Sequence, residues 1–303
     1  MDKSYAELLT GLEILEVSPF FNERLDKEYQ VYCLATREGK SVVLKKVSKE
    51  ECDAYQLLNR VETFPEFINQ TNDSSGEYWL TTEYFPGEDL SILKKEAAIK
   101  LGEELAKLAD CFFEENDSLR TFSPNLKKQI ESKYQLLEKL KSNLGLYKTY
   151  EAYIIRFKGM PKTICHDDLL PINVLFDEKT NQMKILDLEH VRLSSYICDV
   201  ARFGAFYSGD KASFKKGFSF LDEEENIQLF LKTYYSFLTP KIKKQLSFDQ
   251  FMQDYHLECL NQYLLNISYL EEISEEVLKT DWEFYFYQLA IERVRLINKG
   301  RKK

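Results

Sequence analysis

The pattern of apolar and polar residues in the first part of the chain is typical of a small β-sheet with one helix. VYCLAT (31–36) and SVVLKKV (41–47) are rich in strand-forming residues and flank the polar turn 37–40, which predicts a hairpin. KEECDAYQLLNRV (49–61) repeats its apolar residues at helical spacing. A turn-rich stretch at 69–77 then precedes another predicted strand, YWLTTEYF (78–85).

Near residue 90 the pattern changes from strands to helices. The segments 98–113 and 125–140 each gather apolar residues on one helical face, formed by Leu101, Leu105, Leu108 and Phe112 in the first and by Leu126, Ile130, Tyr134 and Leu137 in the second. A β-rich segment at 164–191 follows, and 223–298 is again mainly helical, most clearly at 280–297.

These patterns predict an α+β fold with two lobes. The first lobe, residues 1–85, is small and β-rich with one main helix, and the second, residues 86–303, is larger and mainly helical. Ligands favour the cleft between such lobes.

The composition narrows the class of protein. An apolar share of 44% and a charged share of 30% are those of a soluble globular chain, and no apolar run approaches the roughly 18 residues that span a bilayer. The first residues lack the basic-then-apolar pattern of a signal peptide, so we expect a cytoplasmic protein without a membrane partner. The net charge of −9 argues against binding of nucleic acid and is compatible with a cationic substrate, although acidic runs such as 222–225 are typical of solvated faces.

The six cysteines are scattered and include no CxxC pair. Each falls among apolar residues, which favours reduced, buried thiols over a zinc site or disulfides. The three histidines are too few and too dispersed to indicate a metal cluster.

Candidate chemistry lies in ICHDDLLPINVLF (164–176) and its sequel MKILDLEH (183–190). Two predicted strands, 173–176 and 183–186, would place Asn173 and Asp187 at one end of a hairpin. An amide oxygen and a carboxylate suit Mg²⁺, and Asp168 on the loop leading in can accept the proton of a substrate hydroxyl. Each acid taken alone also fits ordinary turn chemistry, but the Asp at the end of the returning strand favours catalysis.

This ordered set resembles the aminoglycoside phosphotransferase and choline kinase family of small-molecule kinases, which have a protein-kinase-like fold. The family's catalytic loop, His-x-Asp-x-x-x-x-Asn, is matched by His166, Asp168 and Asn173, with Pro171 before the Asn as is common there. The resemblance implies that Asp168 is the catalytic base, that Asn173 and Asp187 are metal ligands and that His166 braces the loop. The family's further anchoring Asp is matched by Asp199 in Cys198-Asp199-Val200-Ala201.

The resemblance extends to the N-terminal strands. Lys45 matches the lysine that holds the α- and β-phosphates of ATP, and Glu51 best fits the acid that orients this lysine, with Glu50 and Asp53 remaining possible. The segment 83–90 resembles the hinge, so that the backbone of Glu83 and Phe85 is expected to pair with adenine.

Two departures from the family pattern stand out. The phosphate-covering turn would fall at Leu25-Asp26-Lys27-Glu28-Tyr29, which contains no glycine to allow close approach to phosphate. Asp167 stands where the family usually has glycine or another small or polar residue, and we expect its side chain to point to solvent.

The resemblance implies an ATP- and Mg²⁺-dependent kinase whose acceptor is a hydroxyl of a small molecule. Amino-sugar antibiotics, choline- or ethanolamine-like alcohols and sugar or nucleoside alcohols all remain open. Glu189 is interpreted either as a contact to a cationic substrate or second metal, or as a surface residue. The aromatic residues of one predicted helix are interpreted either as a wall for an ammonium group or as core; they are Trp282, Phe284, Tyr285 and Tyr287.

A protein kinase is disfavoured because no HRD arginine precedes Asp168 and no APE-like segment follows Asp187. The alternative from another class is a catalytically inactive nucleotide-binding regulatory protein of the same fold. Against it, the lysine, base and metal ligands named above are all retained.

Overall fold

The computed structural model describes residues 1–22, 27–113, 116–207, 225–244, 246–272 and 276–300. The chain divides into two compact units. The first unit joins residues 1–89 to 173–191, and the second joins residues 90–172 to 192–303.

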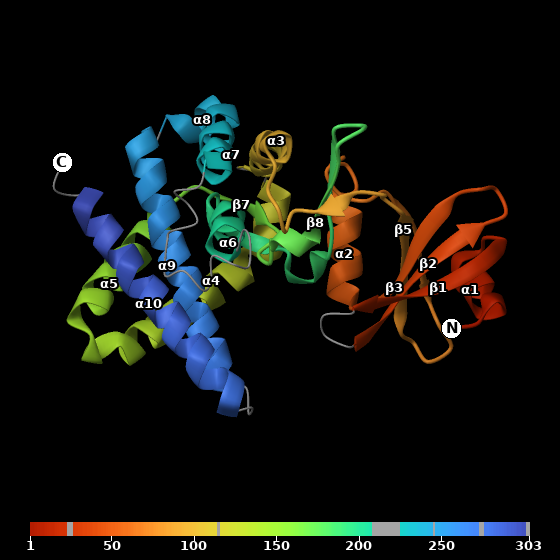
Figure 1. The fold of residues 1–303 in the computed structure, drawn as a ribbon, viewed down its shortest axis with the longest axis horizontal. Helices are drawn as coiled ribbons and strands as arrows, with labels where there is room; N and C mark the ends of the chain where they lie inside the picture. The colour runs from red at the N-terminus through yellow and green to blue at the C-terminus, as the bar shows by residue number, and fades with distance from the viewer. Residues whose placement is uncertain (23–26, 114–115, 208–224, 245, 273–275, 301–303) are drawn as a thin grey trace. The chain divides into compact units, whose positions relative to one another are not determined.

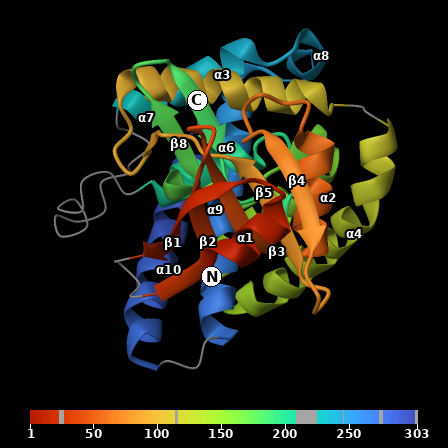
Figure 2. The same ribbon diagram turned by 90° about the vertical axis from the view of Figure 1, so that its right-hand side faces the viewer.

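The first unit is built on a five-stranded antiparallel sheet with the order β1-β2-β3-β5-β4. Helix α1 lies against one face of this sheet and helix α2 against the other (Figures 1 and 2). The elements are α1 (Lys3–Thr10), β1 (Ile14–Asn22), β2 (Lys27–Thr36), β3 (Ser41–Val47), α2 (Lys49–Leu58), β4 (Phe67–Asn72) and β5 (Tyr78–Glu83).

The core of this sheet lies under α1. Ala6 and Leu9 of α1 pack with Leu34 of β2 and with Val42 and Leu44 of β3, all of them buried. Because successive strand residues point to opposite faces, Val43 and Lys45 face away from this core, on the side of α2. The alternation along β3 therefore decides where Lys45 points.

The hairpin predicted around residues 37–40 is formed by β2 and β3, and the predicted strand 41–47 has the bounds of β3. The stretch 69–77 differs from the prediction, because it begins as the end of strand β4. The tight turn starts only at Asp73, whose Oδ1 accepts the backbone N–H groups of Ser75 and Glu77 at 2.9 and 3.0 Å. The end of β4 is rich in Asn and Thr, residues that are also common in turns, so its composition alone predicted a turn.

A second, three-stranded sheet completes the first unit in the order β6-β8-β9. Its strands are β6 (Glu88–Asp89), β8 (Val174–Asp177) and β9 (Gln182–Ile185), and the short 3₁₀ helix η3 (Leu188–His190) follows. The Ile185 N–H donates to Thr63 O at 2.8 Å. These pairings hold 173–191 in the first unit, whereas the predicted division at 85/86 assigned that segment to the second lobe.

The second unit is mainly helical. It contains one two-stranded antiparallel sheet, and its two longest helices, α9 and α10, lie side by side (Figures 1 and 2). The elements are α3 (Lys95–Cys111), α4 (Asn116–Lys139), η1 (Leu140–Ser142), α5 (Leu144–Gly159), β7 (Lys162–Cys165), β10 (Arg192–Ser195), α6 (Cys198–Phe206), α7 (Glu225–Phe237), α8 (Pro240–Lys243), α9 (Phe248–Glu272) and α10 (Glu276–Gly300); a 3₁₀ turn, η2 (Pro171–Asn173), lies where the two units join in sequence.

The apolar face predicted for 98–113 is buried in α3, as expected. The face predicted for 125–140 is wrong in part, because Tyr134 is exposed while Gln129 and Lys133 point inward. Gln129 donates to Leu193 O at 2.7 Å, and the Lys133 ammonium lies 4.4 Å from the centre of the Phe157 ring. Polar side chains that find such partners can face a core, which a count of apolar positions does not detect.

The predicted helix 280–297 lies within α10. The side chains of Trp282, Phe284 and Tyr285, proposed as an aromatic wall, lie outside the described residues. Phe286 is buried, and the hydroxyl of Tyr287 accepts a hydrogen bond from Asn143 at 2.8 Å.

All six cysteines are free thiols. Four are buried, but Cys111 is exposed and Cys33 is partly exposed, so the prediction of buried thiols is wrong for Cys111. Cys111 ends helix α3, where the chain leaves the packed face. Within the described ranges, every helix is too short or too polar to cross a membrane.

Candidate active site

Lys45 lies in a cluster of charges in the first unit. Its Nζ is 2.7 Å from Glu51 Oε1 and 2.6 Å from Asp187 Oδ1, although 142 residues separate Lys45 from Asp187. Glu51 is buried in the first turn of α2, while Glu50 and Asp53 are exposed. Of the three acids that the sequence left open, the structure therefore pairs Glu51 with Lys45.

The electrostatics keep this lysine charged. Burial works to lower the pKa of Lys45, but the carboxylates of Glu51 and Asp187 outweigh it, and the pKa is raised above the ordinary lysine value. Burial raises the pKa of Glu51, and the nearby ammonium only partly opposes this. The result is a fixed cation held by two acids, an arrangement that can bind polyphosphate oxygens.

Asn173 and Asp187 flank the hairpin of β8 and β9 at the same end. Val174 pairs with Ile185, and the Leu186 N–H donates to Asn173 O at 2.8 Å, so the backbone brings Asn173 beside the residue that precedes Asp187. This is the placement that the spacing predicted. Asp187 has a left-handed backbone, with φ 67° and ψ 71°, at the start of η3, and its side chain is 39% exposed.

The donor types at this end of the hairpin fit Mg²⁺, because an amide oxygen and an accessible carboxylate are hard ligands. Among the described residues, no group of three or more His, Cys, Asp or Glu side chains gathers into a metal site. A site with two protein ligands leaves the remaining positions to phosphate and water, as Mg²⁺ usually does.

The residues expected to contact adenine lie at the end of β5. The Glu83 carboxylate is 2.6 Å from the Lys184 ammonium of β9, and the Glu83 N–H donates to Glu66 O at 3.0 Å. Phe85 packs beside Gly87, where an added Cβ would lie 2.6 Å from the Phe85 ring and 2.9 Å from Phe176 N. Gly87 therefore allows this segment to approach β8 closely.

Two further predictions concern the first unit. Glu189 lies on η3 and is exposed, and its role stays a prediction. Residues 25 and 26 of the phosphate-covering turn expected at 25–29 lie outside the described ranges, and residues 27–29 belong to β2.

The predicted catalytic loop begins where β7 ends and is held by Asp199 of α6. Asp199 Oδ2 accepts the His166 N–H at 2.9 Å, and its Oδ1 accepts the Asp167 N–H at 2.8 Å. His166 is buried and its Nδ1 accepts the Asp168 N–H at 3.3 Å. Asp199 and His166 thus fix the backbone that carries Asp168.

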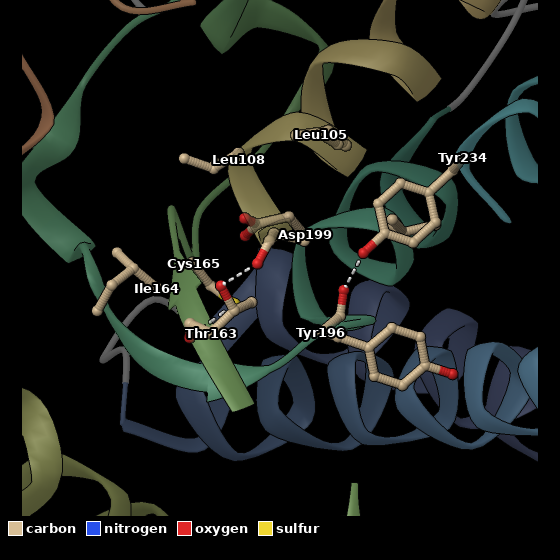
Figure 3. A pocket seen from close by; sticks show the side chains of 10 residues that line it. Leu105, Leu108, Thr163, Ile164, Cys165, Tyr196, Asp199 and Tyr234 are labelled. Carbon is tan, nitrogen blue, oxygen red and sulfur yellow. Dashed lines mark hydrogen bonds between the residues drawn. The ribbon is translucent and has the colours of Figure 1, made fainter. Parts of the chain in front are cut away.

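Burial raises the pKa of the Asp199 carboxyl to about 6, although the two backbone N–H groups that it accepts oppose the shift. A small pocket of about 10 Å³ lies beside Asp199, lined by residues such as Leu105, Cys165 and Tyr234 (Figure 3). It has room for about one water molecule, so it belongs to the packing of the core.

Asp167 does not point to solvent, which corrects the prediction. Its side chain is 11% exposed and its Oδ2 lies 2.5 Å from Arg192 Nη2, while the Cys198 thiol donates to its Oδ1 at 3.2 Å. Asp167 has a φ of 67°, in the left-handed region that glycine enters freely and that Asp and Asn tolerate better than most residues. Glycine would also suit this conformation, and in this chain the Asp side chain lies inward, paired with Arg192.

Asp168 is paired with Arg202, which sequence reasoning missed. Arg202 Nε and Nη2 both donate to Asp168 Oδ1, at 3.1 and 2.7 Å. Arg202 lies one helical turn after Asp199, so both side chains project from α6 toward the same loop. With Asp199 assigned to the loop, the spacing of three residues would have predicted that Arg202 lies on the same side of the helix.

The sheet of the first unit, the helices of the second and the ordered loop and hairpin define a kinase-like α+β fold. The chain belongs to the phosphotransferase enzyme family, whose model matches residues 26–227. Comparison with curated proteins gives no match.

The chain is similar in fold to solved structures of an aminoglycoside phosphotransferase, a choline kinase and a spectinomycin phosphotransferase. An aminoglycoside phosphotransferase from Alicyclobacillus acidocaldarius has 11% identity, with 98% of this chain and 95% of the other covered and a TM-score of 0.58. A choline kinase from Streptococcus pneumoniae has 16% identity, with 97% of each chain covered and a TM-score of 0.54. A spectinomycin phosphotransferase, solved with ADP and spectinomycin, has 13% identity, with 98% of this chain and 97% of the other covered and a TM-score of 0.56.

Proposed function

We propose that this protein transfers the γ-phosphate of ATP, with Mg²⁺, to a hydroxyl of a small molecule. The observation that carries the proposal is the Lys45 ammonium held at 2.7 Å from Glu51 and 2.6 Å from Asp187. A half-buried strand lysine fixed between two acids serves no evident packing purpose, whereas a nucleotide polyphosphate needs such a cation.

In the proposed reaction Lys45 binds phosphate oxygens and the backbone of Glu83 and Phe85 pairs with adenine. Asn173 and Asp187 would hold Mg²⁺, which when bound neutralises charge on the phosphates. Exposed Glu189 is available to the acceptor or to a second metal.

Asp168 orients the acceptor hydroxyl and takes its proton. Phosphoryl transfer of this kind is mostly positioning and charge stabilisation, so the base needs a fixed direction more than a high proton affinity. Asp199 and His166 supply that direction through the backbone bonds to the loop.

The aminoglycoside phosphotransferase, choline kinase and spectinomycin phosphotransferase among the neighbours support a small-molecule acceptor. Amino-sugar antibiotics, choline- or ethanolamine-like alcohols and sugar or nucleoside alcohols form the acceptor panel. At identities of 11–16% these neighbours do not select among them.

The test measures ADP release and phosphorylated product with Mg²⁺-ATP across this panel. Asp168→Asn should lower turnover by about 10²–10⁴-fold while nucleotide binding persists, and Asp187→Ala should remove Mg²⁺-dependent nucleotide binding. Asp110→Asn, an exposed change on α3, is the matched control. Unchanged turnover in Asp168→Asn contradicts the mechanism, and nucleotide binding without turnover of any acceptor favours the regulatory alternative.

A further inference from the structure

Each aspartate of the predicted catalytic loop is paired with its own arginine. Asp167 Oδ2 lies 2.5 Å from Arg192 Nη2 on β10, and Asp168 Oδ1 lies 2.7 Å from Arg202 Nη2 on α6. The two carboxylates are thereby matched by two guanidinium charges within the second unit. The acidic pair, conspicuous in the sequence, does not create the negative field that would attract a cation.

Arg202 is held in place from several sides. Its guanidinium stacks on the Phe206 ring at 4.2 Å, and its Nη1 donates to Gln262 Oε1 at 3.3 Å. Gln262 is buried on α9 and donates in turn to Glu258 Oε1 at 3.2 Å. The Arg202 side chain is only 18% exposed. Its guanidinium therefore has a fixed orientation beside the loop, unlike an arginine that extends freely into solvent.

The other charged groups near the loop already have partners. Buried Glu258 accepts hydrogen bonds from Tyr153 at 2.7 Å and from Asn261 at 2.8 Å, and Asp199 accepts the two loop N–H groups. Arg202 is the cation in direct contact with the Asp168 carboxylate.

A carboxylate beside an aromatic face is the arrangement that binds an ammonium group. Here the Arg202 guanidinium contacts both Asp168 and Phe206, and so it occupies the place that an ammonium group of a ligand would take. A cationic acceptor would meet a like charge beside the base, whereas hydroxyl or carboxylate oxygens would meet a planar hydrogen-bond donor.

We propose that the acceptor is a neutral or anionic hydroxyl compound, such as a sugar, a sugar acid or another polyol, and that Arg202 determines this choice. The proposal rests on the proposed phosphotransfer and narrows its acceptor class. This acceptor class excludes choline-like amines and amino-sugar antibiotics as preferred acceptors. Arg202 acts on the acceptor by its charge and on Asp168 by positioning.

The experiment runs acceptors in series that differ mainly in charge. Glucosamine, glucose and glucuronate share one ring, and choline is compared with its neutral isostere 3,3-dimethylbutan-1-ol. With saturating Mg²⁺-ATP, kcat/KM for phosphorylated product should be at least about tenfold higher for the neutral or anionic member than for the cationic member of a series.

Three variants separate charge from structure. Arg202→Met should reduce that preference at least about tenfold, and Arg202→Lys should retain the preference at a lower kcat because the fork to Asp168 is lost. Arg37→Met, which removes an exposed arginine on the first unit, is the control and should leave the ratio unchanged. A general loss of folding lowers kcat/KM for all members alike and does not move their ratio.

Preference of the wild-type protein for the cationic members, or an unchanged ratio in Arg202→Met, overturns the proposal while leaving phosphotransfer intact. Absence of product in every series, with nucleotide still bound, overturns the proposed function and this acceptor class with it.

Discussion

Replacing Asp199 by Asn should change how the stability of the protein depends on pH. Asp199 is buried and its carboxyl pKa is raised to about 6, against an ordinary value of 3.8. A raised carboxyl pKa means that the folded state binds the proton more tightly than the unfolded state. The contribution of this group to stability is then complete below pH 3.8 and is lost as the pH rises through about 6.

The size of the effect follows from the shift. The difference between 3.8 and about 6 is about two units, and at about 1.4 kcal/mol per unit it corresponds to about 3 kcal/mol of unfolding free energy. The amide that replaces the carboxyl group cannot titrate, so the wild-type stability minus that of Asp199→Asn should fall by up to about 3 kcal/mol between about pH 4 and pH 7.

Urea unfolding at a series of pH values measures the difference in stability between the two proteins. Asp110→Asn, an exposed change in the same unit, controls for removal of a carboxylate. A difference curve for Asp199→Asn that is flat, or that rises with pH, refutes the reasoning. Because Asn offers one acceptor oxygen to the two loop N–H groups, turnover of the variant should also fall at neutral pH.

Three further changes test the packing and the charge cluster. Gly102→Ala should destabilise the protein by about 1–3 kcal/mol in urea unfolding, because its Cβ would lie 2.9 Å from the backbone of α7. Lys45→Met should weaken nucleotide binding at least about tenfold and lower the thermal midpoint, because Glu51 stays buried without its cation; equal affinity by calorimetry would contradict this. Asp167→Ala should lose about 1–3 kcal/mol of unfolding free energy, since Ala neither suits a φ of 67° nor pairs with Arg192, and Asp167→Gly should lose less.

The sequence predicted the structure best where a local secondary-structure pattern and the spacing of candidate catalytic residues pointed to the same arrangement. The strand-forming residues of 41–47 predicted β3 with its bounds, and the turn between the strands after Asn173 predicted that Asp187 returns to the same end. These features depend on periods and spacings, which are properties of the chain itself.

Other features depend on partners that only the folded chain supplies. Lys133 faces inward, where its ammonium lies over an aromatic ring, and Asp167 faces inward, where its carboxylate pairs with Arg192. The pairing of Asp168 with Arg202 requires α6 to lie against the loop. No period in the sequence encodes these contacts, because each joins segments brought together by tertiary packing.

The discontinuous first unit has a consequence for synthesis on the ribosome. Lys45 emerges 142 residues before Asp187, which at about 5–20 residues per second is a delay of roughly 7–30 s. During that interval β3 and α2 exist without the hairpin of β8 and β9, and Glu51 is the only one of the two acids yet made. The five-stranded sheet can form in that interval, but the first unit and its Lys45–Asp187 pair can be completed only after the segment up to residue 191 has been translated.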